Sequence, residues 1–302
     1  MSNMVKGDRV VKCLARKGGF TLSFFSMASL CEVLIDTDNE ALATELGLIA
    51  ANEAWRIEDK YSRYDSNSLC SEINEKAGEV VEIDEETFNL FEFSNHCYDM
   101  SEGAFDITSG ILRKAWHFDG SDNVPSKKCV EALLQLVGWG KVSYSVNSFF
   151  MKKGMEIDFG GLGKEYAVDR AVLLISKVAN IPFLVNYGGD LAVHGTRKND
   201  DPWQVGIEHP SFDASQSTLV TLRTGAVATS GDANRFLLKD NHRYSHILDV
   251  VTGWPVKNPP NSITVAAPQC IQAGFLATLA LIQGVDAENF LKEQNILHWS
   301  IR

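Results

Sequence analysis

The chain has 302 residues, of which 45% are hydrophobic, so it can bury a core as one large domain or as two closely joined ones. Its 28 basic and 39 acidic residues give a formal net charge of −11, which argues against a nucleic-acid groove or an anionic membrane surface as the main partner. No run approaches the ~18 apolar residues of a membrane span, and residues 1–20 lack the continuous apolar stretch of a secretory signal. We therefore expect a cytoplasmic protein with no membrane span and no nucleic-acid partner.

Six cysteines are spread along the sequence without the close pairs of a zinc site. There is no CxxC pair, and no histidine lies at zinc spacing from a cysteine. The sequence therefore predicts buried, reduced thiols at all six positions, which are Cys13, Cys31, Cys70, Cys97, Cys129 and Cys270.

Two amphipathic helices are predicted in the first hundred residues. Residues 39–60 carry apolar positions at helical spacing behind an acidic start, and residues 84–100 begin with acids and repeat their aromatic residues three or four apart. We expect both helices to belong to the scaffold. We also expect residues 1–20 to be a poorly defined N-terminal segment, followed by a single domain over residues 21–302.

Further elements are predicted in the rest of the chain. Ser126 is a suitable N-cap for a helix through residues 127–137, and Gly138 supplies its stop. Residues 141–153 alternate like a hairpin about Asn147-Ser148. The remaining predicted elements are antiparallel strands within residues 203–210, 217–231 and 234–249, with a turn at Asp240-Asn241, and an apolar helix over residues 270–284.

A glycine turn lies in the stretch "DFGGLGKEYAVDRA", which runs from Asp158 to Ala171. The preceding letters "EIDF" (156–159) predict a strand, and a helical pattern starts at Lys164. Strand, glycine turn and helix N-terminus together form a suitable anion site, because free N–H groups and the positive end of the helix dipole point at the turn. The pattern is neither a Walker A loop nor a Rossmann fingerprint, so spacing alone leaves open a phosphate contact or a purely structural turn.

A second buried strand ends in Gly188-Gly189-Asp190. Two glycine turns in succession favour a cleft between them. Lys164 at a helix start is unfavourable for the helix dipole unless an anion lies nearby, which favours the phosphate interpretation of the first turn.

Six motifs, in the same order, resemble the flavin transferases of the ApbE type, which move FMN from FAD onto a protein threonine. The resemblance covers about residues 27–284. The motifs in this sequence are "SRYDSNSLCSEIN" (Ser62 to Asn74), "GAFDIT" (Gly103 to Thr108), "DFGGLGKEYAVD" (Asp158 to Asp169), "NYGGDL" (Asn186 to Leu191), "TSGD" (Thr229 to Asp232) and "YSHILDVVTGWPV" (Tyr244 to Val256).

The resemblance implies an FAD site lined by Met27, Tyr64, Ala104, Phe105, Asp106, Asp158, Lys164 and the stretch Ile247-Leu248. Tyr64 has the chemistry to stack on a ring, with a half-buried structural tyrosine as the alternative. Asp106 and Asp158 either accept hydrogen bonds from the ligand or cap local turns. His246 and Asp249 are the candidate catalytic bases, although a lone histidine on a strand is more often structural.

The family's magnesium site is matched only in part. The resemblance implies ligands at the Gly161 carbonyl and at Thr278, with an aspartate four residues before Thr278, on the same helical face. This chain has Gly274 there. One carboxylate removed at ~4 Å from a cation costs about 4 kcal/mol at an effective dielectric of ~20. We therefore expect a weakened Mg²⁺ site, which Gly274→Asp would restore, with Phe275 as the nearest obstacle.

The fold class predicted from these features is α+β, with a mixed, largely antiparallel sheet flanked by helices in an ApbE-like, T-fold-like architecture. The function implied by the resemblance is metal-dependent attachment of FMN to a threonine of a partner flavoprotein, with release of AMP. Two alternatives share the same pocket. One is an FAD-binding protein with lost or reduced catalysis, and the other is a pyrophosphatase that splits FAD into FMN and AMP with water as nucleophile.

Overall fold

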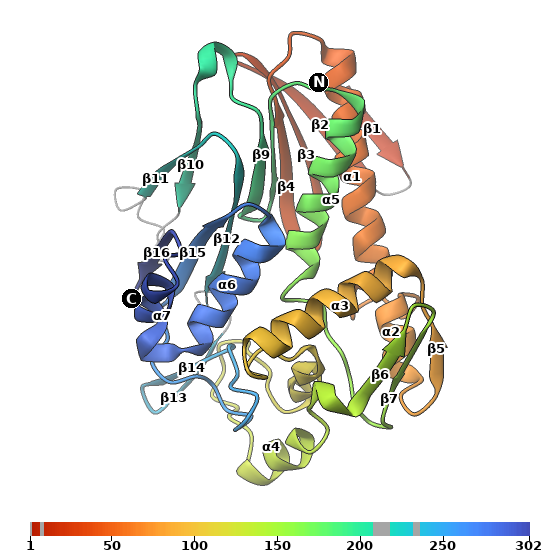
Figure 1. The fold of residues 1–302 in the computed structure, drawn as a ribbon, viewed down its shortest axis with the longest axis vertical. Helices are drawn as coiled ribbons and strands as arrows, with labels where there is room; N and C mark the ends of the chain where they lie inside the picture. Colours follow the sequence, from red (N-terminus) through yellow and green to blue (C-terminus); the bar gives the residue numbers. More distant parts are fainter. Residues whose placement is uncertain (1, 7–8, 208–217, 232–235) are drawn as a thin grey trace.

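A nine-stranded sheet forms the centre of the fold (Figure 1). The computed structural model describes residues 2–6, 9–207, 218–231 and 236–302. The strand order is β1-β2-β3-β4-β8-β9-β12-β15-β16, and all neighbouring pairs are antiparallel. The strands are β1 (Ser2–Lys6), β2 (Arg9–Arg16), β3 (Gly19–Ser26), β4 (Ser29–Ile35), β8 (Phe183–Tyr187), β9 (Asp190–His194), β12 (Gly225–Gly231), β15 (Ser262–Ala267) and β16 (His298–Ile301). The predicted α+β fold class is confirmed.

Three long helices cover one face of this sheet: α1 (Glu40–Tyr61), α5 (Gly163–Val178) and α6 (Cys270–Ile282). Figure 1 shows α1 and α5 side by side over the N-terminal strands, with α6 against β12 and β15. The approach of α1 to β3 depends on Gly47, because a Cβ there would lie 2.2 Å from Leu22 Cγ. In the same layer α5 packs against β8 and β9, and α6 packs against β12 and β15.

The opposite face of the sheet is covered by a short hairpin of β10 (Trp203–Ile207) and β11 (Thr218–Leu222). Its inward residues form a second apolar cluster with the sheet, composed of Leu184, Leu191, Val193, Trp203, Val205, Ile207, Val220, Leu222 and Val227. Both faces of the central strands are therefore buried, as a continuous apolar pattern requires.

A second group of elements lies beyond the α5 N-terminus, in the lower part of Figure 1. It contains a three-stranded sheet in the order β5-β7-β6 and a separate β13-β14 hairpin. The elements are α2 (Leu69–Glu75), β5 (Val80–Glu82), α3 (Glu85–Met100), the 3-10 helix η1 (Ile107–Lys114), α4 (Lys127–Leu134), η2 (Trp139–Lys141), β6 (Val142–Ser145), β7 (Ser148–Met151), β13 (Phe236–Lys239) and β14 (His242–Ser245). The remaining short helices are η3 (Lys198–Asp200), η5 (Gly284–Asp286) and α7 (Ala287–Glu293).

Most predicted helices and turns are confirmed. The helix expected over 39–60 is α1, with the Asn39 side chain accepting from Leu42 N at 3.1 Å, and the one expected over 84–100 is α3. The hairpin over 141–153 is β6-β7, and the predicted turn at Asp240-Asn241 is present, with left-handed backbone at φ of 49° and 58°. The helix expected over 127–137 ends at residue 134, four residues before Gly138.

Three expectations differ from the structure. Residues 156–159 are not a strand, because Ile157 exchanges hydrogen bonds with the Asn74 side chain and Asp158 N donates to Ile107 O, so no ladder forms. Residues 9–16 form β2 within the central sheet, so the sheet shows no boundary at residue 20. Five cysteines are buried free thiols as predicted, but Cys129 is exposed on α4.

None of the helices in the described ranges combines the length and the apolar character that crossing a bilayer requires.

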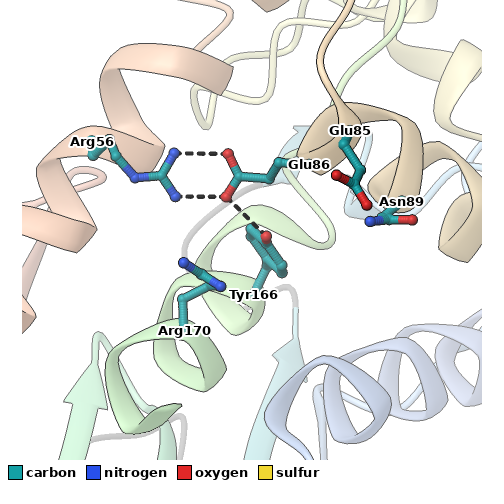
Figure 2. Close-up of a pocket in the computed structure, with 6 residues that line it drawn as sticks. All are labelled: Arg56, Glu85, Glu86, Asn89, Tyr166 and Arg170. Atoms are coloured by element: carbon teal, nitrogen blue, oxygen red, sulfur yellow. Dashed lines mark hydrogen bonds and ion pairs between the residues drawn. The ribbon is translucent and has the colours of Figure 1, made fainter. Parts of the chain in front are cut away.

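A hollow of about 370 Å³ lies where α1, α3 and α5 meet (Figure 2). It is lined by Arg56, Glu85, Glu86, Asn89, Tyr166 and Arg170. The Arg56 guanidinium binds Glu86 in a bidentate pair at 2.6 and 2.7 Å, and Tyr166 Oη donates to Glu86 at 2.9 Å. Because these groups pair with one another across three helices, we interpret the hollow as part of a structural ion-pair network.

Because of this network, we expect the free energy of unfolding to depend on pH in the acid range. Burial alone would raise the pKa of Glu86, but hydrogen bonds from Arg56, Lys60 and Tyr166 outweigh it and lower the pKa from 4.5 to about 2. A lowered folded-state pKa stabilises the fold above pH 4.5, and that contribution is lost as the pH falls towards 2. Glu86→Gln should remove about 3 kcal/mol at neutral pH and flatten this acid dependence in urea titrations. Glu72→Gln, in an exposed pair with Lys76, is the control expected to change little.

Candidate active site at the two glycine turns

The first glycine turn leads directly into α5. The Phe159 carbonyl accepts hydrogen bonds from Leu162 N at 2.9 Å and Gly163 N at 2.8 Å, and the helix begins at Gly163. The N-cap residue, Leu162, makes no side-chain cap hydrogen bond. An α-helix whose first N–H groups lack a capping side chain presents donors and a positive dipole end to an anion.

Lys164 joins the two glycine turns. Its Nζ donates to the carboxylate of Asp190, which follows Gly188-Gly189 and is only 2% exposed. The other Asp190 oxygen accepts from Thr229 N at 3.2 Å. Burial would lower the pKa of Lys164, but the carboxylates of Asp190 and Glu165 outweigh it and raise that pKa. The two turns are thus joined by an ion pair, and Asp190 supplies an anionic partner for the lysine that the sequence interpretation lacked.

Asp158 lies on the other side of the first turn, beside two residues of the "SRYD" motif. Its carboxylate pairs with Arg63 and accepts from Gly160 N at 2.9 Å. The Arg63 guanidinium lies 4.9 Å from the ring centre of Tyr64 and donates to its hydroxyl at 2.7 Å. Tyr64 is 80% exposed, so its ring is available to stack on a ligand rather than half-buried. Sequence reasoning missed Arg63, although its place in the motif beside Tyr64 was a usable signal.

Phe105 and Asp106 are held in the protein interior. One Asp106 oxygen accepts from Thr108 N and Oγ1 at 2.7 and 2.6 Å, and the other from Trp139 N at 2.9 Å. Asp106 therefore caps η1, which is the structural alternative for this residue. Phe105 packs edge-on against Phe275, with ring centres 5.4 Å apart, and lies under the first turn because a Cβ on Gly161 would be 3.7 Å from its ring. Ala104 is partly buried against the same core.

Met27 lies in the tight β3-β4 turn, where it and Ala28 have φ of 51° and 56°. Glu58 of α1 fixes this turn by accepting from Met27 N at 2.8 Å. The turn contacts the second glycine turn, since a Cβ on Gly188 would lie 2.6 Å from Ser29 Oγ. Met27 is therefore placed beside the Gly188-Gly189 turn.

The segment after β14 carries the two candidate bases. Asp249 uses both carboxylate oxygens in its own turn, accepting from Val251 N at 2.8 Å and from Thr252 Oγ1 at 3.0 Å. His246 is partly buried, with its ring 6.2 Å from that of Phe118. Leu248 pairs with Pro255 and packs with the η1 and α4 residues. Asp249 is therefore committed to the turn that follows it.

Thr278 on α6 shares a hydrogen bond with Ser230 at 2.8 Å between their hydroxyl oxygens, which connects α6 to the end of β12. Asp232 of the "TSGD" motif lies outside the described residues. Within the described ranges, no three His, Cys, Asp or Glu side chains form a group that would hold a metal ion by themselves. A metal here would need hydroxyl, carbonyl or substrate oxygens as well.

Gly274 faces Glu165, a residue that sequence reasoning did not single out. A Cβ on Gly274 would lie 2.6 Å from Glu165 Cγ and 2.7 Å from its Oε1. The obstacle to a side chain at position 274 is therefore Glu165 and not Phe275, which corrects the expectation above. Burial, followed by the charge of Asp190, raises the pKa of Glu165 to about 8. The signal for it was an acidic residue, Glu165, at an otherwise apolar-facing position directly after Lys164 in "GKEYAVD".

Comparisons with known proteins identify the family and the fold. The sequence profile of the ApbE family matches residues 27–298. The chain is 27% identical to the FAD:protein FMN transferase of Vibrio cholerae over 85% of this chain and 78% of that protein. It superposes on the ApbE protein of Thermotoga maritima with a TM-score of 0.83 and 29% identity, covering 93% and 94% of the two chains. The flavinyl transferase ApbE of Pseudomonas stutzeri shares the fold, with a TM-score of 0.81 at 24% identity over 99% and 93% of the chains. The protein described here belongs to the ApbE family.

Proposed function

We propose that this protein transfers FMN from FAD to a threonine side chain of a partner flavoprotein and releases AMP. The observation that carries the proposal is the Lys164-Asp190 contact, which joins two glycine turns at the uncapped N-terminus of α5. Such a place suits the pyrophosphate of FAD, because backbone donors, a helix dipole and a lysine converge on it. Membership of a family whose relatives bear the name FAD:protein FMN transferase supports the same reaction.

We propose ligand contacts for the side chains around the two turns. The exposed Tyr64 ring offers a stacking surface, and Arg63 beside it adds positive charge. Asp158 offers carboxylate oxygens to hydroxyl or ring N–H groups, while Phe105 supports the turn from below. We assign Met27, Ala104 and Leu248 to the edges of the site, and Asp106 to holding η1 in place.

The transfer step is a displacement at phosphorus. The threonine oxygen forms a bond to the FMN-side phosphorus, and the bond from that phosphorus to the bridging oxygen breaks, with AMP keeping the electron pair. The hydroxyl proton passes to a base, for which we propose His246, since Asp249 uses both its oxygens in a turn. Lys164 and the α5 N-terminus offset the charge of the pyrophosphate.

Magnesium fits this arrangement through the Gly161 carbonyl and the Thr278 hydroxyl, with substrate phosphates as further ligands. A bound Mg²⁺ would neutralise phosphate charge as it develops. The buried Glu165 carboxyl group lies opposite Gly274, four residues before Thr278 on α6.

The direct test is an assay with FAD, Mg²⁺ and a purified flavoprotein or peptide carrying an acceptor threonine. Covalent flavin on the acceptor together with equimolar AMP is the expected result. AMP without covalent flavin would instead identify a pyrophosphatase, and bound but unchanged FAD would identify a binding protein. An acceptor with its threonine replaced by valine is the matched control, and it should remain unlabelled.

Binding should also depend on the pyrophosphate. We expect FAD to bind at least about tenfold more tightly than riboflavin, because a phosphate at a helix N-terminus near a lysine gains about 1.4 kcal/mol or more.

Tyr64→Ala should weaken FAD binding by a similar factor without lowering the thermal midpoint, since the ring is exposed. Calorimetry measures both effects. Equal affinities for FAD and riboflavin would contradict the assignment of the glycine turn.

A further inference from the structure

Glu165 is buried but incompletely satisfied. It is the third residue of α5 and is 7% exposed, and across the described residues its Oε2 has no hydrogen-bond partner. The nearest cation, Lys164 Nζ, binds Asp190. A buried carboxyl oxygen without a donor is costly, and native proteins keep such groups where a ligand or an ion completes them.

The contact between α5 and α6 shows where this carboxyl group points. Asp169 caps α6 by accepting from Cys270 N at 2.8 Å and Ile271 N at 2.9 Å. Glu165 lies one turn before Asp169 on α5, and it contacts Gly274, which lies one turn after Cys270 on α6. The two helices therefore run past each other in opposite directions, and the Glu165 carboxyl group fills the space that a side chain at 274 would enter.

If the antiparallel register of the two helices continues by one more turn, it points to two further oxygen atoms. One further turn along α6 is Thr278, about 6 Å along the axis and on the same face as Gly274. On the α5 side, Gly161 lies four residues before Glu165, in the glycine turn that precedes the helix. Carboxylate, hydroxyl and carbonyl oxygens are the ligands that hard divalent cations prefer.

We propose that Glu165 supplies, from α5, the carboxylate ligand of a divalent cation site that includes Thr278, in place of a side chain at position 274. Gly274 is then explained as the residue that makes room for this carboxylate. The proposal rests on the proposed function only for the phosphates that complete the coordination. In this arrangement the carboxylate comes from α5, whereas an aspartate at position 274 would supply it from α6.

The competing interpretation is that Glu165 is a protonated space filler at a helix start. The two interpretations make different predictions for Glu165→Gln, which keeps the shape and removes the charge. If Glu165 only fills space, the Glu165→Gln variant should bind the metal as tightly as wild type. If Glu165 is a ligand, the variant should lose metal affinity, while the metal-free protein stays folded.

The experiment is a Mn²⁺ titration followed by electron paramagnetic resonance, with and without ADP as a pyrophosphate probe. We expect wild type to bind Mn²⁺, and Glu165→Gln to bind it about a hundredfold more weakly or worse. Glu53→Gln is the matched control, because Glu53 is as buried but fully paired with Arg56 and Arg170, and it should keep wild-type affinity. Thermal melts without metal check that each variant is folded.

A charge swap makes the test independent of how Glu165→Gln folds. Glu165→Gly alone should lose Mn²⁺ binding, and Glu165→Gly combined with Gly274→Asp should regain it, because the carboxylate returns from the other helix. Equal Mn²⁺ affinity in wild type and Glu165→Gln would overturn the proposal, as would absence of Mn²⁺ binding to wild type under both conditions. If Mn²⁺ binding depends on Glu165 but no FMN transfer is found, the cation site is supported and the proposed function is contradicted.

Discussion

Gly274→Asp by itself should destabilise the protein by about 3 kcal/mol or more, the range for overpacking combined with an unpaired buried charge. The new Cβ would lie 2.6 Å from Glu165 Cγ and 2.9 Å from its Cδ, and two carboxyl groups would share one buried space. Urea denaturation at neutral pH measures the loss. The sequence alone had suggested that this substitution would restore a metal site, with Phe275 as the nearest obstacle.

The second variant in this test is Glu165→Gly, which empties the space. In the double variant the stability should return to within about 1 kcal/mol of wild type, so the two changes are strongly non-additive. Gly274→Ala separates the causes, because it adds the steric clash without the charge. Independent, additive effects of the two substitutions would show that Glu165 and position 274 do not share this space in solution.

Lys164→Met should cost about 3–5 kcal/mol, because it leaves the buried Asp190 carboxylate without its cation. Adding Asp190→Asn should recover most of that loss, since an amide oxygen can still accept from Thr229 N. Chemical denaturation of the four proteins in this cycle measures the coupling.

FAD affinity separates the two roles of Lys164. We expect the double variant to regain stability but not tight FAD binding, because the lysine charge near the pyrophosphate is still absent. Calorimetry on the folded double variant provides the measurement. Wild-type FAD affinity in that variant would mean that Lys164 only partners Asp190.

Local features of the fold were determined by the sequence itself. The helices α1, α3 and α5 follow from apolar spacing and from caps such as Asn39, and the turn at Asp240-Asn241 follows from residues that accept a left-handed backbone. The family was recognised from motifs as short as "GAFDIT", and the profile match confirms it. These features depend on residues within a few positions of one another, so the linear sequence contains the physical cause.

Features that depend on distant partners were decided only by the tertiary structure. Residues 156–159 have a strand-like pattern, yet their backbone bonds go to Asn74 and Ile107. Asp158 meets Arg63 across 95 positions of sequence. Gly274 appeared in the sequence as a missing carboxylate, and only the packing of α5 against α6 shows that Glu165 occupies its place. Periodicity records which face of an element is buried, but the neighbour that a buried atom meets depends on how whole helices and strands pack.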